Sequence, residues 1–473
     1  MKIAMLSMEM VPFSKVGGLA DVMGSLPIAL SAFSKISVIT PYYGQITENL
    51  YSKFSDQKLN TVTFKELEIL NHKVKILKTE YKGIEVFLVS NKELFEREGI
   101  YLDKEGKPFE DEVLRYYVFS LAAESLLQDF DVIHCHDWHT TFTIILAKLK
   151  NFKNTIFTIH NIAYQGIFEK EKLNFLNEEV KNLLFQYGEY YGKVNLMKAA
   201  ILLSDFVTTV SPNYANEIQN SSEFGMGLEN ILKQNSHKIV GILNGIDQEL
   251  WNPKKDKHIY FNYSIENVEE GKKENKRRLL NDLNLKEAGY LFGIVARLDH
   301  QKGFDILANA VENLEIGKFN LVVLGTGNVE IQNSIKKLSE KYPEFISVNI
   351  GFDEALARKI YAASDFFIIP SRFEPCGLSQ MISYKYGTIP IATRVGGLKD
   401  TIIDIFENKE NGTGILIDKA DPNLLYQAMN KAINLSTQDL QNLRKRVMQL
   451  DFSWSKSAQK YIELYQKLLS LKT

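Results

Sequence analysis

Residues 1–30 read MKIAMLSMEMVPFSKVGGLADVMGSLPIAL, and this stretch decides the fold class. Its apolar start predicts a β-strand over Lys2–Met8. Gly17 and Gly18 then open a helical run that continues through Leu30. A strand followed by a glycine-containing turn and a helix is the first half of a βαβ unit, so the stretch predicts an α/β protein built on a parallel sheet.

The same alternation continues along the chain. Further strands of the first half are predicted at Ile36–Thr40, Val74–Leu77, Val86–Val89, Val132–Cys135, Thr155–Ile159, Val207–Val210 and Ile239–Leu243, with a helix at Asp111–Leu127. Strands of the second half are predicted at Leu291–Val295, Asn320–Leu324, Ile346–Ile350, Phe366–Ile369, Ile389–Thr393 and Ile415–Ile417, with helices at Asp353–Ala363, Asp421–Leu435 and Ser453–Leu469. Most of these strands are continuous apolar runs, which is typical of parallel strands buried on both faces.

The length of 473 residues indicates two domains, because a single core stops growing near about 250–300 residues. We expect two doubly wound, Rossmann-like α/β domains facing each other across a cleft, one over residues 1–245 and one over 246–450. Residues 252–275 carry many charges and little apolar periodicity, and they are interpreted as a connecting segment. The helical stretch over 451–473 follows, and pattern alone does not assign it to either domain.

Composition excludes several classes of protein. Hydrophobic residues make up 45% of the chain, which argues against disorder. The 56 Lys and Arg nearly balance the 58 Asp and Glu, so no general nucleic-acid footprint is expected. The basic clusters Lys272–Lys273 and Lys276–Arg278 are interpreted as a solvated helix face.

The cellular location is inferred from what the sequence lacks. Only two cysteines occur, Cys135 and Cys376, which indicates a reducing compartment. The N-terminal apolar run is short and ends at Glu9, unlike a signal peptide. No stretch reaches the roughly 18 apolar residues of a membrane helix. We therefore expect a cytoplasmic protein with no membrane partner.

Candidate ligand groups of the first half follow predicted strands. Lys15-Val-Gly-Gly-Leu-Ala-Asp21 joins glycines, a helix start and a cation, which suits a phosphate, although a plain turn is the alternative. His134-Cys-His-Asp-Trp-His139 fits a polar rim for sugar hydroxyls, a metal site or buried hydrogen-bonded histidines. His160 and Asn161 offer further hydrogen-bonding groups after the next strand.

The second half repeats this placement. Arg297 and Lys302 could clamp a diphosphate, or belong to an ordinary loop. Gly325-Thr-Gly327 is a weak nucleotide motif, and Phe352 could stack on a base or pack in the core. Ser371–Gln380 brings Glu374 and the N–H groups of Cys376, Gly377 and Leu378 to a helix start, where Glu374 could also be a capping acid. Gly396-Gly-Leu-Lys-Asp400 echoes the first motif and could also be a plain turn.

Taken together, these segments resemble the bacterial glycogen synthase and plant starch synthase family. The matching stretches are Lys15–Val22, His136–Thr140, Thr158–Gly166, Thr208–Tyr214, Phe224–Leu228, Ile242–Pro253, Arg297–Asp305, Pro370–Gln380, Tyr386–Pro390, Gly396–Thr401 and Asp451–Ser455. The pair Lys-x-Gly-Gly-Leu-Ala-Asp and Ser-Arg-Phe-Glu-Pro-Cys-Gly-Leu is highly specific to that family.

The resemblance implies the GT-B architecture, with an acceptor-side first domain, a nucleotide-sugar-side second domain and the helix of 451–473 crossing back to the first. It implies a hexosyltransferase that moves glucose from ADP-glucose to the non-reducing end of an α-1,4-glucan, with retained configuration, release of ADP and no required metal or cofactor. The alternatives are another GT-B nucleotide-sugar transferase that builds a surface glycan, and a catalytically inactive glucan-binding protein.

The resemblance also implies roles for individual residues. The catalytic set would be Glu374, His160, Asp137, Arg297 and Lys302. The donor-binding set would be Lys15, Gly17, Gly18, Asp21, Asn161, Asn244, Gly325, Gly327, Phe352, Cys376, Gly377 and Leu378. Phe352 stands where the family often has Tyr and Ser379 where it often has Thr. These departures bear on donor preference rather than on the reaction type.

Overall fold

The N-terminal strand lies at the centre of a large sheet in the computed structural model, which describes residues 1–55 and 58–471. Among those residues the sheet has nine strands in the order β12-β11-β7-β6-β1-β2-β5-β4-β3. The strands are β1 (Lys2–Leu6), β2 (Lys35–Pro41), β3 (Val62–Ile69), β4 (His72–Tyr81), β5 (Ile84–Ser90), β6 (Val132–His136), β7 (Thr155–Ile159), β11 (Phe206–Thr209) and β12 (Ile239–Gly241). The pairings from β12 to β5 are parallel, as predicted.

The far edge of this sheet differs from the prediction. β4 pairs antiparallel with both β5 and β3, and β3 was not predicted at all. The sequence of β3, VTFKELEI, alternates charged and apolar residues and is mostly exposed, so it lacks the apolar run that marks a buried strand. Such charged, half-exposed strands are common at sheet edges, where they discourage pairing with other chains.

Helices cover this sheet and complete the first compact unit, called unit 1. They are α1 (Gly18–Ser31), α2 (Gln45–Phe54), α3 (Glu112–Glu124), α4 (Thr141–Leu149), α5 (Glu178–Gly188), α6 (Leu196–Leu203), α7 (Pro212–Asn220), α8 (Ser222–Gly225) and α9 (Glu229–Gln234). A small antiparallel sheet joins β8 (Ile167–Phe168), β10 (Lys193–Asn195) and β9 (Glu189–Tyr190).

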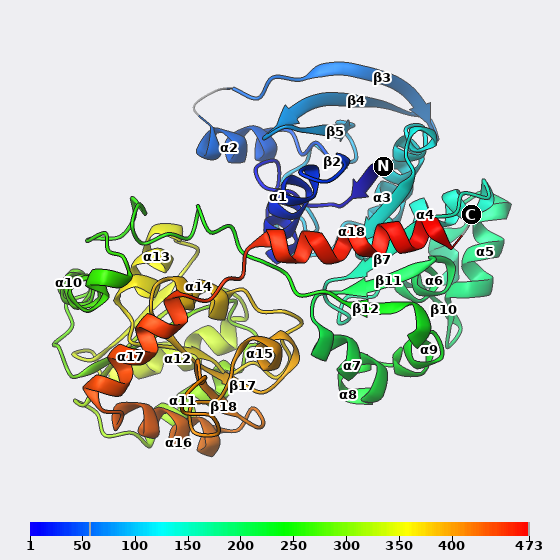
Figure 1. Cartoon of the computed structure of the whole chain (residues 1–473). Coiled ribbons are helices and arrows are strands. Elements are labelled where there is room, and N and C mark those ends of the chain that lie inside the picture. The colour runs from blue at the N-terminus through cyan, green and yellow to red at the C-terminus, as the bar shows by residue number, and fades with distance from the viewer. Residues whose placement is uncertain (56–57, 472–473) are drawn as a thin grey trace. The chain divides into compact units, whose positions relative to one another are not determined.

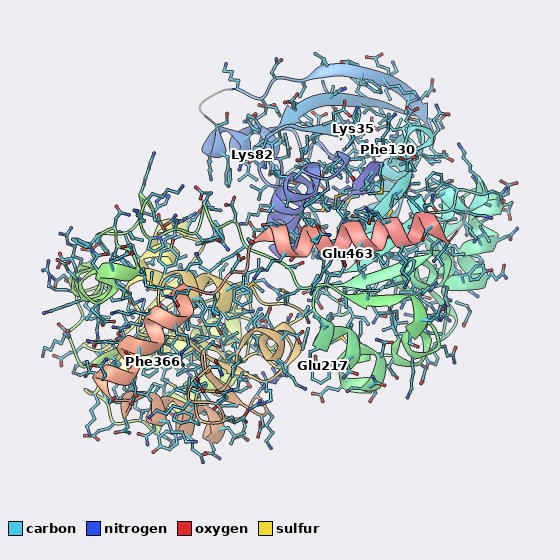
Figure 2. The ribbon with its side chains drawn as sticks, in the orientation of Figure 1. Lys35, Lys82, Phe130, Glu217, Phe366 and Glu463 are labelled. Atoms are coloured by element: carbon cyan, nitrogen blue, oxygen red, sulfur yellow. The ribbon has the colours of Figure 1, made fainter. Side chains whose placement is uncertain are left out.

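The last helix, α18 (Trp454–Ser470), also belongs to unit 1, together with Met1–Gly245. It packs along α1 (Figure 1) and buries Trp454, Tyr461 and Tyr465. Its opposite face is polar, as at the exposed Glu463 that Figure 2 labels. The helix therefore supplies part of the core of unit 1 from the other end of the chain.

Unit 2, Ile246–Ser453, contains a parallel sheet in the order β15-β14-β13-β16-β17-β18. Its strands are β13 (Tyr290–Val295), β14 (Phe319–Gly325), β15 (Ile346–Ile350), β16 (Phe366–Ile369), β17 (Ile389–Thr393) and β18 (Ile415–Ile417). Its helices are α10 (Val268–Asp282), α11 (Phe304–Glu312), α12 (Val329–Lys341), α13 (Glu354–Ala363), α14 (Ser379–Lys385), α15 (Gly396–Thr401), α16 (Pro422–Ile433) and α17 (Thr437–Met448).

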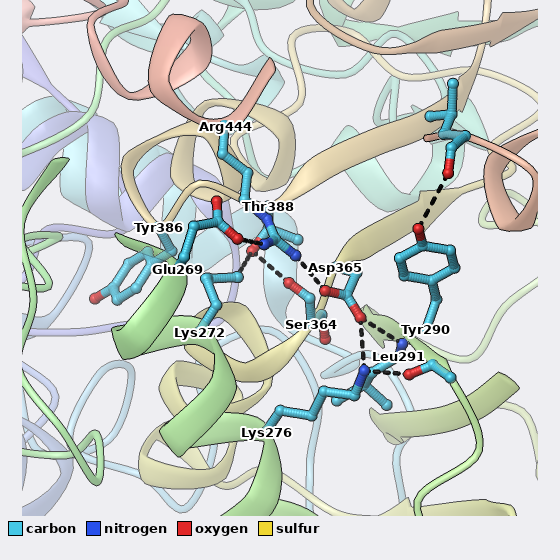
Figure 3. A network of polar contacts seen from close by, with 12 residues as sticks. Glu269, Lys272, Lys276, Tyr290, Leu291, Ser364, Asp365, Tyr386, Thr388 and Arg444 are labelled. Carbon is cyan, nitrogen blue, oxygen red and sulfur yellow. Dashed lines mark hydrogen bonds and ion pairs between the residues drawn. The ribbon is translucent and has the colours of Figure 1, made fainter. Parts of the chain in front are cut away.

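Two predictions for unit 2 are wrong around α10. The predicted connecting segment 252–275 contains the start of this helix, and Lys272, predicted on a solvated face, is buried. Lys276 joins Asp365 and Arg444 in a network of polar contacts at the amino ends of β13 and β16 (Figure 3). The buried face of α10 includes polar side chains that have hydrogen-bond or ion-pair partners. The sequence of this helix therefore lacks the apolar periodicity that would predict a buried face.

Both sheets share the doubly wound strand order in which the chain starts at a central strand, fills one side and then returns to fill the other. The order reverses between β1 and β6 in unit 1, and between β13 and β16 in unit 2. Ligands bind beyond the carboxyl ends of strands at such reversals. No helix within residues 1–55 and 58–471 is long and apolar enough to cross a membrane.

Candidate active site

The loop before α1 is held by an acid that the sequence analysis did not assign. The Glu9 carboxylate accepts hydrogen bonds from the backbone N–H groups of Val16 and Gly17, the latter at 2.9 Å, and from the Tyr101 hydroxyl at 2.8 Å. Burial raises the pKa of Glu9 above its ordinary value. Two N–H groups of the predicted phosphate turn are therefore already satisfied. Glu9 is visible in the sequence only as the acid that ends the first apolar run.

Lys15, predicted as a mobile cation, forms an ion pair in this loop. Its Nζ lies 2.6 Å from Oδ1 of Asp21, in the first turn of α1, and both side chains are partly exposed. Gly18 begins the helix. An anion that approached this helix start would meet a lysine already held in place by Asp21.

Asp137 and His160, predicted at the ends of two strands, lie together. Asp137 follows β6 with a positive φ of 59°, and its Oδ1 accepts the backbone N–H of His160 at 2.9 Å. Burial raises the pKa of Asp137 to about 7, against hydrogen bonds from His160 and Asn161 that lower it. The carboxylate thus fixes the loop after β7, in which Asn161 Oδ1 accepts from Ala163 N at 3.0 Å.

The histidines around β6 form a buried cluster. His136 Nδ1 lies 2.9 Å from His160 Nε2, and the His134 and His136 rings are in contact, with centroids 4.2 Å apart and planes inclined by 30°. His139 stacks on Trp138 at 4.0 Å. Burial lowers the pKa of His134, His139 and His160 to about 3 and that of His136 well below its ordinary value, so all four are neutral at pH 7. In the described part of the chain no group of three or more His, Cys, Asp or Glu side chains could hold a metal ion.

We expect unit 1 to lose stability on acidification below about pH 6.5. Unfolded histidines take up protons near that pH, whereas these four stay neutral in the folded state, so their stabilisation is lost as pH falls. The raised pKa of Asp137 acts in the opposite direction, because its folded form gains a proton as pH falls through about 7. Glu9, whose pKa is also raised by burial, acts in the same direction as Asp137. The net difference is therefore at most about three protons, which corresponds to at most about 4 kcal/mol per pH unit near pH 5.

The measurement is urea unfolding between pH 7.5 and pH 5, followed by hydrogen exchange in β6 and β7. The matched variant is His139→Phe, which removes one titrating ring whose Nδ1 has no hydrogen-bond partner within residues 1–55 and 58–471. It should reduce the slope of unfolding free energy with pH by about a third. A free energy of unfolding that is equal at pH 7.5 and pH 5 would contradict the prediction.

A hollow of about 450 Å³ adjoins this cluster in unit 1. It is lined by Trp138, Ala163, Tyr164, Gln165, Gly166, Ile167 and Met226. Its volume is in the range of small-molecule sites, and its tyrosine and tryptophan suit the apolar faces of sugar rings. Asn244, predicted to bind the donor, is buried in unit 1 and does not line this hollow, and its Oδ1 has no hydrogen-bond partner in the part of the chain that the structure describes.

In unit 2 the structure brings Lys302 and Glu374 together. Lys302 Nζ lies 2.5 Å from Glu374 Oε2, which also accepts a hydrogen bond from the Ser371 hydroxyl at 2.9 Å. The two residues come from the loops after β13 and β16, the adjacent strands at which the strand order reverses. With Ser371 they line a small cavity at the carboxyl ends of these strands. Both side chains are mostly buried, so the ion pair is shielded from water.

The remaining predicted donor contacts of unit 2 surround these strand ends. Arg297 is half-exposed and pairs with Asp299 at 3.0 Å. The glycine motif after β14 lies against the loop after β13, where Leu298 N donates to Thr326 O at 2.9 Å and Gly327 forms a bridge with Leu298. Phe352 is 83% exposed, so it is not a core residue.

The helix after Glu374 begins later than predicted. α14 starts at Ser379 with Leu378 as its N-cap, so Cys376 and Gly377 precede the helix instead of forming its first turn. Gly377 has a φ of +72° that redirects the chain between Glu374 and α14. Cys376 is buried.

The second Gly-Gly motif supports the Glu374 loop. Gly397 N donates to Glu374 O at 3.1 Å and to Pro375 O at 3.2 Å. Gly396 has a φ of +46°, and a Cβ added there would lie 1.9 Å from the carbonyl oxygen of Glu374. The backbone of α15 can approach this loop only because Gly396 has no side chain.

We expect Gly396→Ala to lower the turnover number by about 10- to 100-fold, because the added methyl group displaces the backbone that carries Glu374. The control is Gly317→Ala, which has a similarly strained φ of +94° and no atom closer than 3.9 Å to the new Cβ. Gly317→Ala should lose about 1–2 kcal/mol of stability from backbone strain alone, and Gly396→Ala should lose more, because its new Cβ also overlaps the Glu374 carbonyl oxygen. Activity that falls equally in both would assign the effect to backbone strain alone.

The chain is similar to known proteins over almost its entire length. Residues 2–234 match the family described as Starch synthase catalytic domain, and residues 275–449 match Glycosyl transferases group 1. A glycogen synthase of Fervidobacterium nodosum is 40% identical, with 99% of each chain covered. A glycogen synthase of Alkaliphilus metalliredigens is 39% identical, with 99% of this chain and 100% of the relative covered.

Solved structures agree with this similarity. The catalytic domain of starch synthase IV from Arabidopsis thaliana, bound to ADP and acarbose, superposes with a TM-score of 0.86. It is 33% identical, and 99% of each chain is covered.

Proposed function

This chain belongs to the family of bacterial glycogen synthases and plant starch synthases, and we propose that it uses ADP-glucose as its donor. The chain is a glycosyltransferase with glycogen synthase function. In the proposed reaction, glucose passes to the non-reducing end of an α-1,4-glucan with retained anomeric configuration, and ADP leaves. The starch synthase that this chain resembles was solved with ADP and acarbose, a pair that matches the proposed product and a sugar chain.

The observation that carries the proposal is the Lys302–Glu374 pair at the carboxyl ends of β13 and β16. A diphosphate would compete with Glu374 for the Lys302 ammonium, and Arg297 would add a second cation. The freed Glu374 carboxylate would accept hydrogen bonds from the hydroxyl groups of the donor glucose. These cations would stabilise the charge that develops on the departing ADP.

Further residues of unit 2 complete the proposed donor site. Phe352 is exposed and would stack on the base, and Gly325 and Gly327 leave the backbone of the loop after β14 open to the nucleotide. Backbone groups at Cys376, Gly377 and Leu378 would bind the sugar beside Glu374. Unit 2 is thus the proposed nucleotide-sugar side.

Unit 1 is the proposed acceptor side. His160 and Asp137 would contact the reacting sugars, and the hollow beside Trp138 would hold part of the glucan. The remaining proposed donor contacts of this unit are Lys15, Gly17, Gly18, Asp21, Asn161 and Asn244. Because side-chain cations are present for the diphosphate, we propose that no metal or other cofactor is required.

The proposed setting is the cytoplasm, with neither nucleic acid nor membrane as a partner. Its basis is the near-zero net charge and the two buried thiols, Cys135 and Cys376.

The test is transfer of radiolabelled glucose to glycogen. ADP-glucose and UDP-glucose are supplied in parallel, with and without a chelator. Transfer from ADP-glucose that resists the chelator is the expected result. Transfer only from UDP-glucose would overturn the donor assignment, and loss of transfer with the chelator would overturn the metal-free reaction. Binding of glycogen without transfer from either donor would favour a glucan-binding protein.

A further inference from the structure

His160, the proposed contact of the reacting sugar, is held by a second histidine. His136, the last residue of β6, places Nδ1 at 2.9 Å from Nε2 of His160, with the two rings inclined by 33°. The His136 side chain is fully buried, whereas His160 is partly exposed at the end of β7. The pair therefore connects the core of unit 1 to the surface where a ligand can reach His160.

Only one hydrogen can lie between these two nitrogens. Both rings are neutral at pH 7, because burial lowers the pKa of each. A neutral imidazole carries a hydrogen on one nitrogen and a lone pair on the other. One ring must therefore donate and the other accept, and this choice determines which nitrogen of His160 carries its hydrogen.

The second nitrogen of His136 decides between the two arrangements. His136 Nε2 is buried and has no hydrogen-bond partner among the described residues. If His160 were the donor, His136 would carry its hydrogen on Nε2, and a buried N–H would be left without an acceptor. If His136 donates from Nδ1, its Nε2 holds only a lone pair. A buried N–H without a partner is the rarer and costlier defect.

We propose that His136 is a positioning residue that donates from Nδ1 to His160 Nε2 and so holds His160 as the tautomer with hydrogen on Nδ1. This inference rests on the proposed function of His160. In that tautomer His160 offers its ligand an N–H donor at Nδ1 and cannot accept a proton there. His160 would then act by hydrogen bonding to a sugar oxygen instead of as a general base.

The cluster behind His136 limits its movement. The His134 ring packs against the His136 ring with centroids 4.2 Å apart, and its own nitrogens lie 2.8 Å from the Tyr465 hydroxyl of α18 and 2.6 Å from Oγ1 of Thr158. Thr158 Oγ1 in turn lies 2.5 Å from Oγ1 of Thr208. The His136 ring is therefore packed against a side chain that is hydrogen-bonded on both nitrogens, which restricts its rotation.

The direct test is nitrogen NMR of protein labelled with ¹⁵N-histidine, with the His160 signals assigned by their loss in His160→Gln. We expect His160 to show a protonated Nδ1 and an unprotonated Nε2 in the native protein at pH 7.5. The opposite pattern would overturn the proposal. This readout does not depend on catalysis, so it remains decisive even if the chain proves not to transfer glucose.

Two substitutions test the positioning role. His136→Leu removes the donor, whereas His136→Asn keeps an N–H group where Nδ1 stood. His136→Leu should lower the turnover number by about 10- to 100-fold, with a smaller change in the KM for ADP-glucose. Its His160 spectrum should no longer show the single native tautomer. His136→Asn should restore most of the activity and the native spectrum.

The control is Thr143→Val in α4, which removes another buried hydrogen bond, the 3.0 Å contact to Ser120. It should lower stability comparably and leave both the His160 spectrum and the turnover number unchanged. Equal loss of activity in His136→Leu and His136→Asn, with a native His160 spectrum in both, would reduce His136 to a packing residue.

Discussion

Glu374→Gln should lower the turnover number for transfer from ADP-glucose to glycogen by about 10²- to 10³-fold, while ADP binds as tightly as before or more tightly. The substitution removes a charge that the proposal places on the donor sugar. It also frees Lys302, which the structure pairs with Glu374 at 2.5 Å, to bind the diphosphate. A loss of catalysis without a loss of ADP affinity is therefore the distinguishing result.

The measurement combines steady-state transfer kinetics with calorimetric titration of ADP. Asp305→Asn is the matched control, because Asp305 forms an ion pair with Arg372, two residues before Glu374, at 2.6 Å and in a more exposed position. It should retain most of the activity. ADP affinity that falls in parallel with turnover in Glu374→Gln would contradict the proposed exchange of partners at Lys302.

Among the substitutions, the largest effect on stability is expected from Asp365→Asn in unit 2. Asp365 precedes β16, and its carboxylate accepts the Leu291 N–H at 2.7 Å and pairs with Lys276 at 3.0 Å and with Arg444 (Figure 3). Burial alone would raise the pKa of Asp365, but the two cations hold it below its ordinary value. Neutralising this side chain leaves Lys276 without its counter-charge and Arg444 with Glu269 as its remaining acidic partner, which should cost about 3–5 kcal/mol.

The two-unit chain need not unfold in one step, so the effect should be read by hydrogen exchange in β13 and β16 at increasing urea. Glu274→Gln is the matched control on the same helix. Glu274 pairs with Arg277 and Arg278 on the exposed side of α10, and its loss should change stability little, because exposed ion pairs are screened by water. Equal effects of the two substitutions would show that the buried network contributes no more than a surface pair.

The sequence predicted the central strands of both sheets because parallel strands buried on both faces are continuous apolar runs. β7, β15, β16, β17 and β18 have the predicted bounds. The same reasoning could not find β3, whose charged residues face water at the sheet edge, or the start of α10, whose buried face contains Lys272 and Asn275. A polar side chain can be buried where the fold supplies a hydrogen-bond partner. Because such partners are distant in the sequence, the local pattern does not predict the burial.

The site was predicted in part for a similar reason. Placement after strands singled out Asp137, His160, Lys302 and Glu374 as separate candidates. The structure brings Asp137 into contact with His160 and Lys302 into contact with Glu374. Glu9 was missed because its partner Tyr101 is 92 residues away. The role of Gly396 could not be predicted either, because the backbone that it contacts is that of Glu374, which is distant in the sequence. The roles of Glu9 and Gly396 follow from their tertiary contacts, which the local sequence pattern does not contain.

The position of α18 has a consequence for how the protein is made. A ribosome delivers the strands of unit 1 first, but Tyr461 and Tyr465, which belong to its core, emerge only after all of unit 2. Unit 2 is one uninterrupted segment, so it can fold during synthesis while unit 1 still exposes the apolar groove beside α1. The domain that begins first is thus the last to be finished, and a released chain that ended at Ser453 would carry all of unit 2 and a unit 1 without α18.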